Sequence, residues 1–254
     1  MRFNDFTAKL YEFAPLELSK AMVEKGSHDN SGVILKLHDE VEKVLFALDL
    51  TESAVLKAVK ANADTIVTHH PAIFYPILRL ELGGENSALA MAAFYGLNVI
   101  SLHLNLDIAK GGIDDQLAQA FSPTEVKVIE FMTKEHGYGR EFKVEKTTIS
   151  DIVETMKSKL KAVNITVFSK GEKVVKKVAS FCGGGSSHAV KYGGNADLII
   201  TSDMPHHIIL SMVESGKAVV LITHYTAEMF GFKKFADYCS KFIETVVFDD
   251  KRYY

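Results

Sequence analysis

The sequence is poor in cysteine, proline and tryptophan, with two, five and none among its 254 residues. Cys182 and Cys239 lie on separate predicted elements, which excludes a disulfide framework. So few prolines, with no low-complexity stretch, argue against a long flexible linker. No apolar run approaches the roughly 20 residues that span a bilayer, and the N-terminus lacks the basic-then-apolar pattern of a signal peptide. We therefore expect a cytoplasmic protein that does not contact membranes.

An excess of charge of one sign is also absent. The chain has 29 Lys and Arg against 32 Asp and Glu, a formal net charge of −3. Binding to nucleic acid requires clustered basic side chains that neutralise phosphates, so this balance argues against nucleic acid as a partner. The 47% hydrophobic content suffices for one large core or two smaller ones.

An internal repeat is the most informative pattern in the sequence. Residues 62–68 (NADTIVT) reappear 133 positions later as residues 195–201 (NADLIIT). Two further pairs of segments align in the same order: 43–44 with 177–178, and 96–103 with 216–224. Three anchors in one order predict a duplicated structural unit.

Each copy shows short Val- and Ile-rich runs alternating with helical patterns. The predicted order is strand, helix, strand, helix, strand, at 43–48, 52–61, 64–68, 87–95 and 98–102, and again at 177–182, 186–192, 197–201, 206–215 and 218–223. Amphipathic helices at about 5–13 and 148–161 precede the two copies. The pattern predicts an α/β fold of two internally repeated units with mainly parallel or mixed sheets. Residues 122–147 contain Ser-Pro and Gly-Tyr-Gly-Arg and indicate a boundary between domains 1–122 and 123–254.

Histidines and carboxylates follow the predicted strands, at the sheet edge where α/β proteins bind ligands. These metal-competent groups are His69, His70, His103, Asp107, His224 and Glu228. In both His-x3-acid pairs a helical turn would place the two side chains on one face. Imidazole with carboxylate suits Zn, Fe, Mn or Co, and a carboxylate can bridge two ions. Any single histidine is more often a hydrogen-bonded structural residue, and we interpret His28, His38, His136 and His188 in that way, but the joint pattern favours a metal site.

Two other features each allow two interpretations. The Gly-rich loop Gly183–Ser187 between a strand and a helix can bring N–H groups to a phosphate or simply pack closely. Arg140 can clamp an anionic substrate or be exposed.

Three motifs together resemble the NGG-interacting-factor-three-like family, whose members are also labelled GTP cyclohydrolase 1 type 2 homologues. The motifs are His69-His70-Pro71, His103-x-Asn105-x-Asp107 and His224-Tyr225-x-x-Glu228. Segments Asp29–Gly32, Gly137–Arg140 and Gly183–Ser187 extend the resemblance over nearly the whole chain. The sequence departs from the family pattern at His28, where a tryptophan is frequent, and at Ser202-Asp203, where Gly-Asp is usual.

The resemblance implies that the two α/β units are intertwined around a shared dinuclear metal centre and that the protein forms ring-shaped homohexamers. Its ligands would be His69, His70, Asp107, His224 and Glu228, with His103 beside them as a catalytic group or as a residue that orients Asp107. The implied function is a metal-dependent hydrolase that uses a metal-bridging hydroxide on a small molecule, a nucleotide or cyclic amide. The alternative is a metal-binding regulatory or protein-interaction module without turnover.

Overall fold

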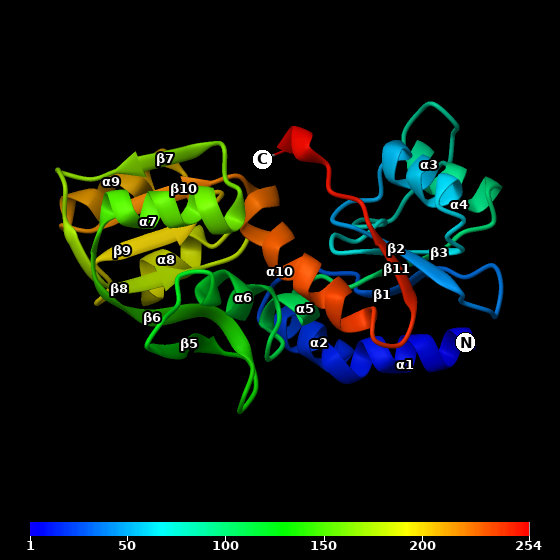
Figure 1. The fold of residues 1–254 in the computed structure, drawn as a ribbon, viewed down its shortest axis with the longest axis horizontal. Coiled ribbons are helices and arrows are strands. Elements are labelled where there is room, and N and C mark those ends of the chain that lie inside the picture. Colours follow the sequence, from blue (N-terminus) through cyan, green and yellow to red (C-terminus); the bar gives the residue numbers. More distant parts are fainter. Residues whose placement is uncertain (254) are drawn as a thin grey trace. The chain divides into compact units, whose positions relative to one another are not determined.

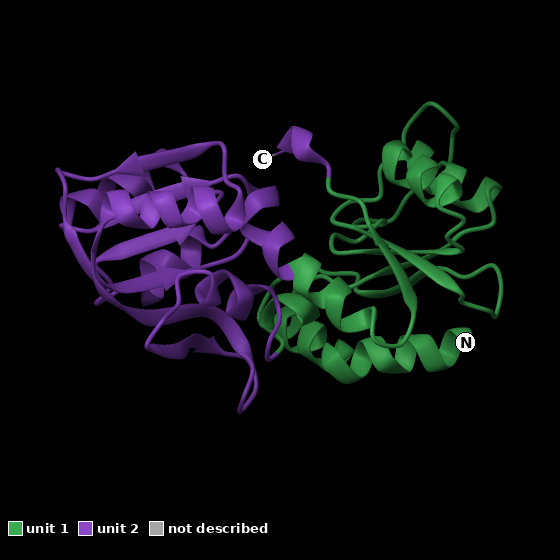
Figure 2. Ribbon diagram, viewed as in Figure 1, with its two compact units in different colours: residues 1–109, 232–249 green, residues 110–231, 250–254 purple. Residues whose placement is uncertain are grey.

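The computed structural model describes residues 1–253 and has a mixed α/β fold with two sheets (Figure 1). This confirms the predicted fold class. The chain forms two compact units (Figure 2). Unit 1 consists of residues 1–109 and 232–249, and unit 2 consists of residues 110–231 with 250–253.

Unit 1 is built on a five-stranded sheet in the order β1-β4-β3-β2-β11. Its strands are β1 (Gly32–Leu35), β2 (Lys43–Ala47), β3 (Thr65–Thr68), β4 (Asn98–Ser101) and β11 (Glu244–Val247). All adjacent pairs are parallel except β1 with β4. Its helices are α1 (Phe3–Phe13), α2 (Leu16–Glu24), α3 (Glu52–Lys60), α4 (Ser87–Phe94), α5 (Leu104–Ile108) and the second part of α10 (His224–Cys239).

Helices cover both faces of this sheet, which explains why its central strands are buried apolar runs (Figure 1). Leu45 of β2 joins a core cluster with α3, and the α3 N-terminus is capped by Thr51, whose side chain accepts a hydrogen bond from the Ala54 amide. The next residue, Phe46, points to the other face and packs its ring against Phe232 of α10, at a centroid distance of 6.0 Å.

Unit 2 is built on a six-stranded sheet in the order β5-β6-β8-β9-β10-β7. Its strands are β5 (Glu125–Phe131), β6 (Gly137–Thr148), β7 (Ile165–Phe168), β8 (Val174–Ser180), β9 (Leu198–Thr201) and β10 (Ala218–Ile222). Its helical segments are α6 (Ile113–Gln119), α7 (Ile149–Thr155), the π-helix η1 (Met156–Leu160), α8 (Ser186–Tyr192), α9 (His206–Glu214), the start of α10 and the 3₁₀ turn η2 (Lys251–Tyr253). The β5–β6 hairpin occupies most of the segment 122–147 that the sequence marks as a boundary.

The internal repeat is visible in the topology of the two sheets. Strands β2, β3 and β4 form a parallel trio, as do β8, β9 and β10, and an antiparallel strand lies beyond β4 and beyond β10. The repeated aspartate has the same role in both. The Asp64 carboxylate accepts hydrogen bonds from the backbone amides of residues 42 and 43, at 2.7 and 2.9 Å. The Asp197 carboxylate accepts the equivalent hydrogen bonds from residues 176 and 177, at 3.0 and 3.1 Å. The shared Asn-Ala-Asp sequence therefore ties the middle strand of each trio to its neighbour.

Among the described residues, every helix is too short or too polar to cross a membrane.

Candidate metal centre

The two adjacent histidines lie at the carboxyl end of β3, where backbone hydrogen bonds fix their positions. The His69 and His70 amides both donate to the Leu48 carbonyl, at 3.1 and 2.9 Å. The Thr68 hydroxyl donates to the His70 carbonyl at 2.8 Å. The peptide units that carry both imidazoles are thus attached to the end of the neighbouring strand β2.

Three imidazoles of unit 1 are oriented through the same nitrogen, Nδ1. The acceptors, each at 2.8 Å, are the Leu102 carbonyl for His69, Asp49 Oδ1 for His70 and Asp29 Oδ1 for His103. A carbonyl or an ionised carboxylate can only accept, so Nδ1 carries the proton and Nε2 becomes the ligand nitrogen. The three histidines offer ligand atoms that all lie within 4.8 Å of one another. These residues fit a metal ion.

Asp107 belongs to the same group. His103 precedes α5, and the Asp107 amide donates to the His103 carbonyl at 3.0 Å, which is the helical turn that the spacing of four predicted. The Asp107 side chain is buried, and its Oδ1 lies 3.3 Å from His69 Nε2. Unit 1 therefore brings together four of the six predicted groups.

Asp29 lies in a loop that precedes β1, and its carboxylate accepts the hydrogen bond from His103 Nδ1. Its side chain is inaccessible to solvent and accepts hydrogen bonds from His103 and from the hydroxyls of Ser19 and Ser31. Burial alone would raise the pKa of Asp29, but the hydrogen bonds from His103 and the two serines outweigh it and lower the pKa to about 2. Asp29 therefore remains ionised as the partner of His103. Sequence reasoning missed this role, although Asp29 begins one of the family-like segments.

The remaining two predicted groups meet in unit 2, at the start of α10. His224 Nε2 lies 3.0 Å from Glu228 Oε1, one helical turn away, and His224 Nδ1 lies beside the carboxylate of Asp203. Burial alone would lower the pKa of His224, but Glu228 and Asp203 outweigh it and raise the pKa to about 10. The contact of His224 Nδ1 with the Asp203 carboxylate repeats the Nδ1-to-acceptor arrangement of the three histidines of unit 1.

The Gly-rich loop packs its backbone against this pair. Gly183 has φ +56°, and a Cβ there would lie 2.7 Å from Glu228 Oε1 and 3.2 Å from the His224 ring. The hydroxyls of Thr201 and Ser202 donate to the Gly183 carbonyl at 3.1 and 2.5 Å. Glycine is required at residue 183 because a side chain would displace Glu228.

Arg140 is neither exposed nor directed to an outside anion, so the interpretation of this residue as exposed is wrong. It retains 2% of its surface, pairs with Asp115 and donates to the carbonyls of Gly137 and Gly139 at 2.8 and 3.0 Å. The adjacent Asp114 carboxylate accepts hydrogen bonds from the backbone amides of Gly139 and Cys182. This buried network connects α6, β6 and the start of the Gly-rich loop.

The fold and the histidine–carboxylate groups define a mixed α/β protein with a candidate metal centre, and comparison with known proteins identifies its family. The family model Duf34/NIF3 (NGG1p interacting factor 3) matches residues 1–251, so the chain belongs to that family.

Individual relatives and solved structures agree with this membership. The chain is 32% identical over 244 residues to a "GTP cyclohydrolase 1 type 2 homolog" of Methanocaldococcus jannaschii, covering 94% of this chain and 95% of the relative. It is 31% identical over 203 residues to "NGG1-interacting factor 3" of Saccharomyces cerevisiae, covering 73% and 70%. The solved structure "Reduced HcgD from Methanocaldococcus jannaschii" matches with a TM-score of 0.84 and 28% identity, covering 98% of both chains.

Proposed function

We propose that the six groups form one centre for two divalent metal ions, of Zn, Fe, Mn or Co. The ligands are His69, His70, Asp107, His224 and Glu228. The observation that carries the proposal is the orientation of the imidazoles of His69, His70 and His224, each fixed through Nδ1 so that Nε2 is the ligand nitrogen. The carboxylates of Asp107 and Glu228 would offset the charge of the two cations.

The continuity of α10 supports the inclusion of the two unit 2 residues. Phe232, which belongs to unit 1, places its ring 5.9 Å from that of His69. Glu228 precedes Phe232 by four residues on the same helix, a rise of about 6 Å. One helical turn thus separates Glu228 from a residue that already packs against a proposed ligand.

The proposed activity is hydrolysis of a small molecule, a nucleotide or a cyclic amide, as the names of the relatives suggest. When bound by these residues, two divalent ions would supply Lewis-acid chemistry, which lowers the pKa of water and offsets developing negative charge. His103 accepts and returns the proton, since a neutral imidazole works near pH 7. The ionised Asp29 carboxylate orients its ring and stabilises it once protonated.

Turnover of GTP by the metal-loaded protein, with metal content measured on the same sample, tests the proposal. We expect His69→Ala to lose both metal and turnover. His103→Ala should keep both ions and lose roughly 10² to 10⁴ in turnover, whereas His206→Ala, at an exposed histidine of α9, should match the wild type. A fall in metal content proportional to the loss of activity in His103→Ala would make His103 a ligand instead.

The alternative is a metal-dependent regulatory or protein-interaction module, which the name of the yeast relative favours. A fully metal-loaded wild-type protein that hydrolyses neither nucleotides nor cyclic amides would support it.

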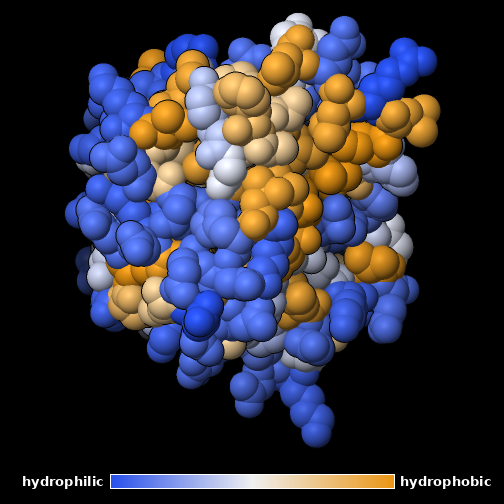
Figure 3. Space-filling model, turned by 90° about the vertical axis from the view of Figure 1, so that its right-hand side faces the viewer, coloured by the Kyte–Doolittle hydropathy of each residue, from blue (hydrophilic) through white to orange (hydrophobic). Residues whose placement is uncertain are grey.

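We further propose that the protein assembles as a homo-oligomer, a hexamer by its resemblance to the family. Large apolar side chains are exposed on unit 1, including Leu78 at 96% and Phe94 at 74%, and Figure 3 shows apolar surface gathered on one face. Light scattering during size-exclusion chromatography tests this state, and a mass of 28.1 kDa would contradict it.

A further inference from the structure

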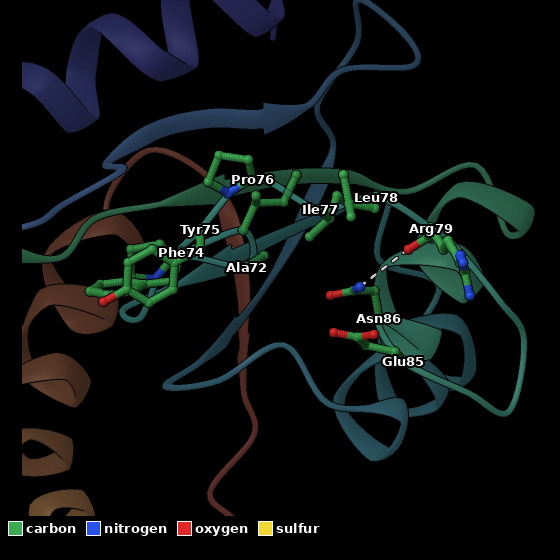
Figure 4. A pocket seen from close by; sticks show the side chains of 11 residues that line it. Ala72, Phe74, Tyr75, Pro76, Ile77, Leu78, Arg79, Glu85 and Asn86 are labelled. Carbon is green, nitrogen blue, oxygen red and sulfur yellow. Dashed lines mark hydrogen bonds between the residues drawn. The ribbon is translucent and has the colours of Figure 1, made fainter.

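A cavity of about 190 Å³ in unit 2 has no role in the proposed metal chemistry. A different cavity, of about 530 Å³ in unit 1, begins at Pro71, directly after the proposed ligand His70 (Figure 4). The unit 2 cavity is lined by the β7–β8 loop, residues 169–173, and by residues around the α9–β10 turn, Val213, Gly216 and Lys217. Both segments end where β8 and β10 begin, so the cavity lies at the amino edge of the parallel strands. His224 follows β10 at the opposite, carboxyl edge.

The path of the chain brings lysines to this edge. Strand β7 lies beyond β10, whereas β8 lies on the other side of β9, so the β7–β8 loop passes the amino ends of β10 and β9. On that path the Lys173 ammonium donates to the Gly216 carbonyl at 2.7 Å, and the Lys217 ammonium donates to the Gly194 carbonyl at 2.6 Å. Each ammonium also approaches a second carbonyl at 3.4 Å. Two cations are thus fixed beside one cavity.

These two cations have no carboxylate partner among the described residues. Lys170 forms an ion pair with a glutamate of α9 at 3.0 Å, but neither Lys173 nor Lys217 forms one. The carboxylate of Glu172 accepts hydrogen bonds from the amide and hydroxyl of residue 150 in α7, both at 3.2 Å. Burial lowers the pKa of Lys217, and the Lys173 ammonium lowers it further, although Asp197 opposes them. An anion in the cavity would relieve this repulsion.

The internal repeat shows that the fold does not require a lysine at residue 217. The equivalent residue in unit 1 is Leu97. Each follows a glycine of positive φ, +71° at Gly96 and +85° at Gly216, and each amide donates to the carbonyl five residues earlier, at 2.9 and 3.1 Å. Leu97 retains 3% of its surface and packs in the core of unit 1. Unit 2 therefore keeps a cation where the same turn accepts an apolar side chain, which is the kind of local cost that functional sites carry.

We propose that this cavity binds a small tetrahedral oxyanion, a phosphate group, held by Lys173 and Lys217. Each ammonium has three N–H groups, of which the backbone carbonyls take at most two, so each can donate one more to a phosphate oxygen. The volume of about 190 Å³ is below the roughly 300 to 1,000 Å³ of sites that enclose a whole organic ligand, which favours a free ion or one phosphate group of a larger molecule. The site does not depend on the proposed hydrolase.

Acetylation of individual lysines in the full-length protein tests the proposal. The protein is treated with N-hydroxysuccinimidyl acetate in inorganic phosphate or in sodium chloride of equal ionic strength, and each lysine is quantified by peptide mass spectrometry. Phosphate at ten times its Kd should slow the acetylation of Lys173 and Lys217 about tenfold, because an occupied site shields its amines. Lys60 and Lys176, which are exposed and outside the cavity, should react equally fast in both solutions.

Two variants locate the anion. Lys217→Leu introduces the side chain that unit 1 has at this position, and phosphate should then protect Lys173 with an affinity at least about tenfold weaker, since hydrogen bonds between charged groups are the strong ones. Lys173→Met should weaken the protection of Lys217 similarly, and it keeps the test independent of the folding of Lys217→Leu. Lys176→Met is the matched control and should leave both protections as in the wild type.

Glycerol 3-phosphate in place of inorganic phosphate identifies the source of the phosphate group. Protection at a lower concentration than inorganic phosphate requires would assign a phosphate monoester, and protection by inorganic phosphate alone would assign the free ion. Either result supports the site.

Equal acetylation of Lys173 and Lys217 in phosphate and in chloride would overturn the proposal, as would unchanged protection of Lys173 in Lys217→Leu. His69→Ala separates this site from the candidate metal centre. It should lose metal and keep the protection by phosphate. Loss of protection together with the metal would show that phosphate acts through the metal centre and would refute the site.

Discussion

Asp29 couples the stability of unit 1 to pH through its contacts with Ser19, Ser31 and His103. Its pKa falls from 3.8 to about 2 in the folded chain, so the folded state binds a proton less readily than the unfolded state. Its contribution is complete above about pH 4 and is lost as the pH falls toward 2. This contribution of Asp29 to the free energy of unfolding is about 2 kcal/mol.

We therefore expect Asp29→Asn to lower the free energy of unfolding by about 2 kcal/mol at pH 7, and by progressively less below pH 4. Urea unfolding at a series of pH values measures the difference. Asp39→Asn is the control, because that carboxylate is exposed and its salt bridge with Lys36 lies at the surface, where such pairs contribute little to stability. A wild-type-to-variant difference that stays constant down to pH 2.5 would rule out the coupling.

Gly183 allows a second prediction about single residues. Gly183→Ala introduces a Cβ 2.7 Å from Glu228 Oε1, so the carboxylate must move. Glu228 is itself a proposed ligand, so its displacement should weaken metal binding by at least the roughly 10- to 100-fold that loss of a group supporting the ligands costs. We expect that loss in competition titrations of chelator-treated protein with Zn²⁺. Gly184→Ala is the matched control, since its Cβ would have no neighbour within 4 Å. Equal zinc affinities for the two variants would contradict the packing argument.

The sequence predicted which residues bear the candidate ligands but not how they are oriented. His69, His70 and Asp107 were predictable because they follow buried strands, where a parallel sheet presents its carboxyl edge. Their hydrogen-bond partners were not predictable. Asp29 and Asp49 come from loops that precede β1 and α3, and no local pattern links an acid to an imidazole on another loop.

At the scale of elements, the buried pair Arg140 and Asp114 joins β6 to α6. Arg140→Met would leave the buried Asp114 and the partly exposed Asp115 without their cation, and we expect the free energy of unfolding in urea to fall by about 3 to 5 kcal/mol. Lys177→Met is the comparison, because Lys177 pairs with Glu141 on the same sheet with both side chains 28% exposed. The Lys177→Met substitution should lower the free energy of unfolding by less than about 1 kcal/mol. Similar costs for the two variants would show that the buried pair has no special role.

The bounds of the helices and strands within the internal repeat were predicted closely, whereas strands outside it, such as β5, β6 and β11, were not predicted. The helix at 186–192 and the strand at 98–102 fall within a residue or two of α8 and β4, because alternating apolar runs and helical patterns define them locally. The β5–β6 hairpin lies in a stretch whose Pro and Gly residues indicated a boundary. Neither of its strands alternates regularly between buried and exposed residues: β5 pairs only with β6, and β6 in turn pairs with β8, a partner distant in sequence. Strand β11 likewise depends on β2, a partner far away in sequence.

At the scale of the whole molecule, a centre with ligands from both units predicts that metal stabilises both together. Zn²⁺ at 100 times its Kd should add about 3 kcal/mol. Hydrogen exchange measured by mass spectrometry should show new protection around residues 65–70 of unit 1 and around residues 183–203 of unit 2. His69→Ala should lose both effects, and His206→Ala should lose neither. Protection confined to one unit would mean that the ions bind within that unit alone.

The return of the chain to unit 1 through β11 sets an order for folding during synthesis. Strand β11 pairs with β2, Glu244 opposite Lys43, so the outer edge of β2 has no partner until nearly the whole polypeptide has left the ribosome. The sheet of unit 2 uses only residues 125–222 and is complete in the nascent chain before that. The sheet that is started first is therefore finished last. In the meantime β2 presents an open strand edge, the kind of surface that nascent chains pair with wrongly and that chaperones shield.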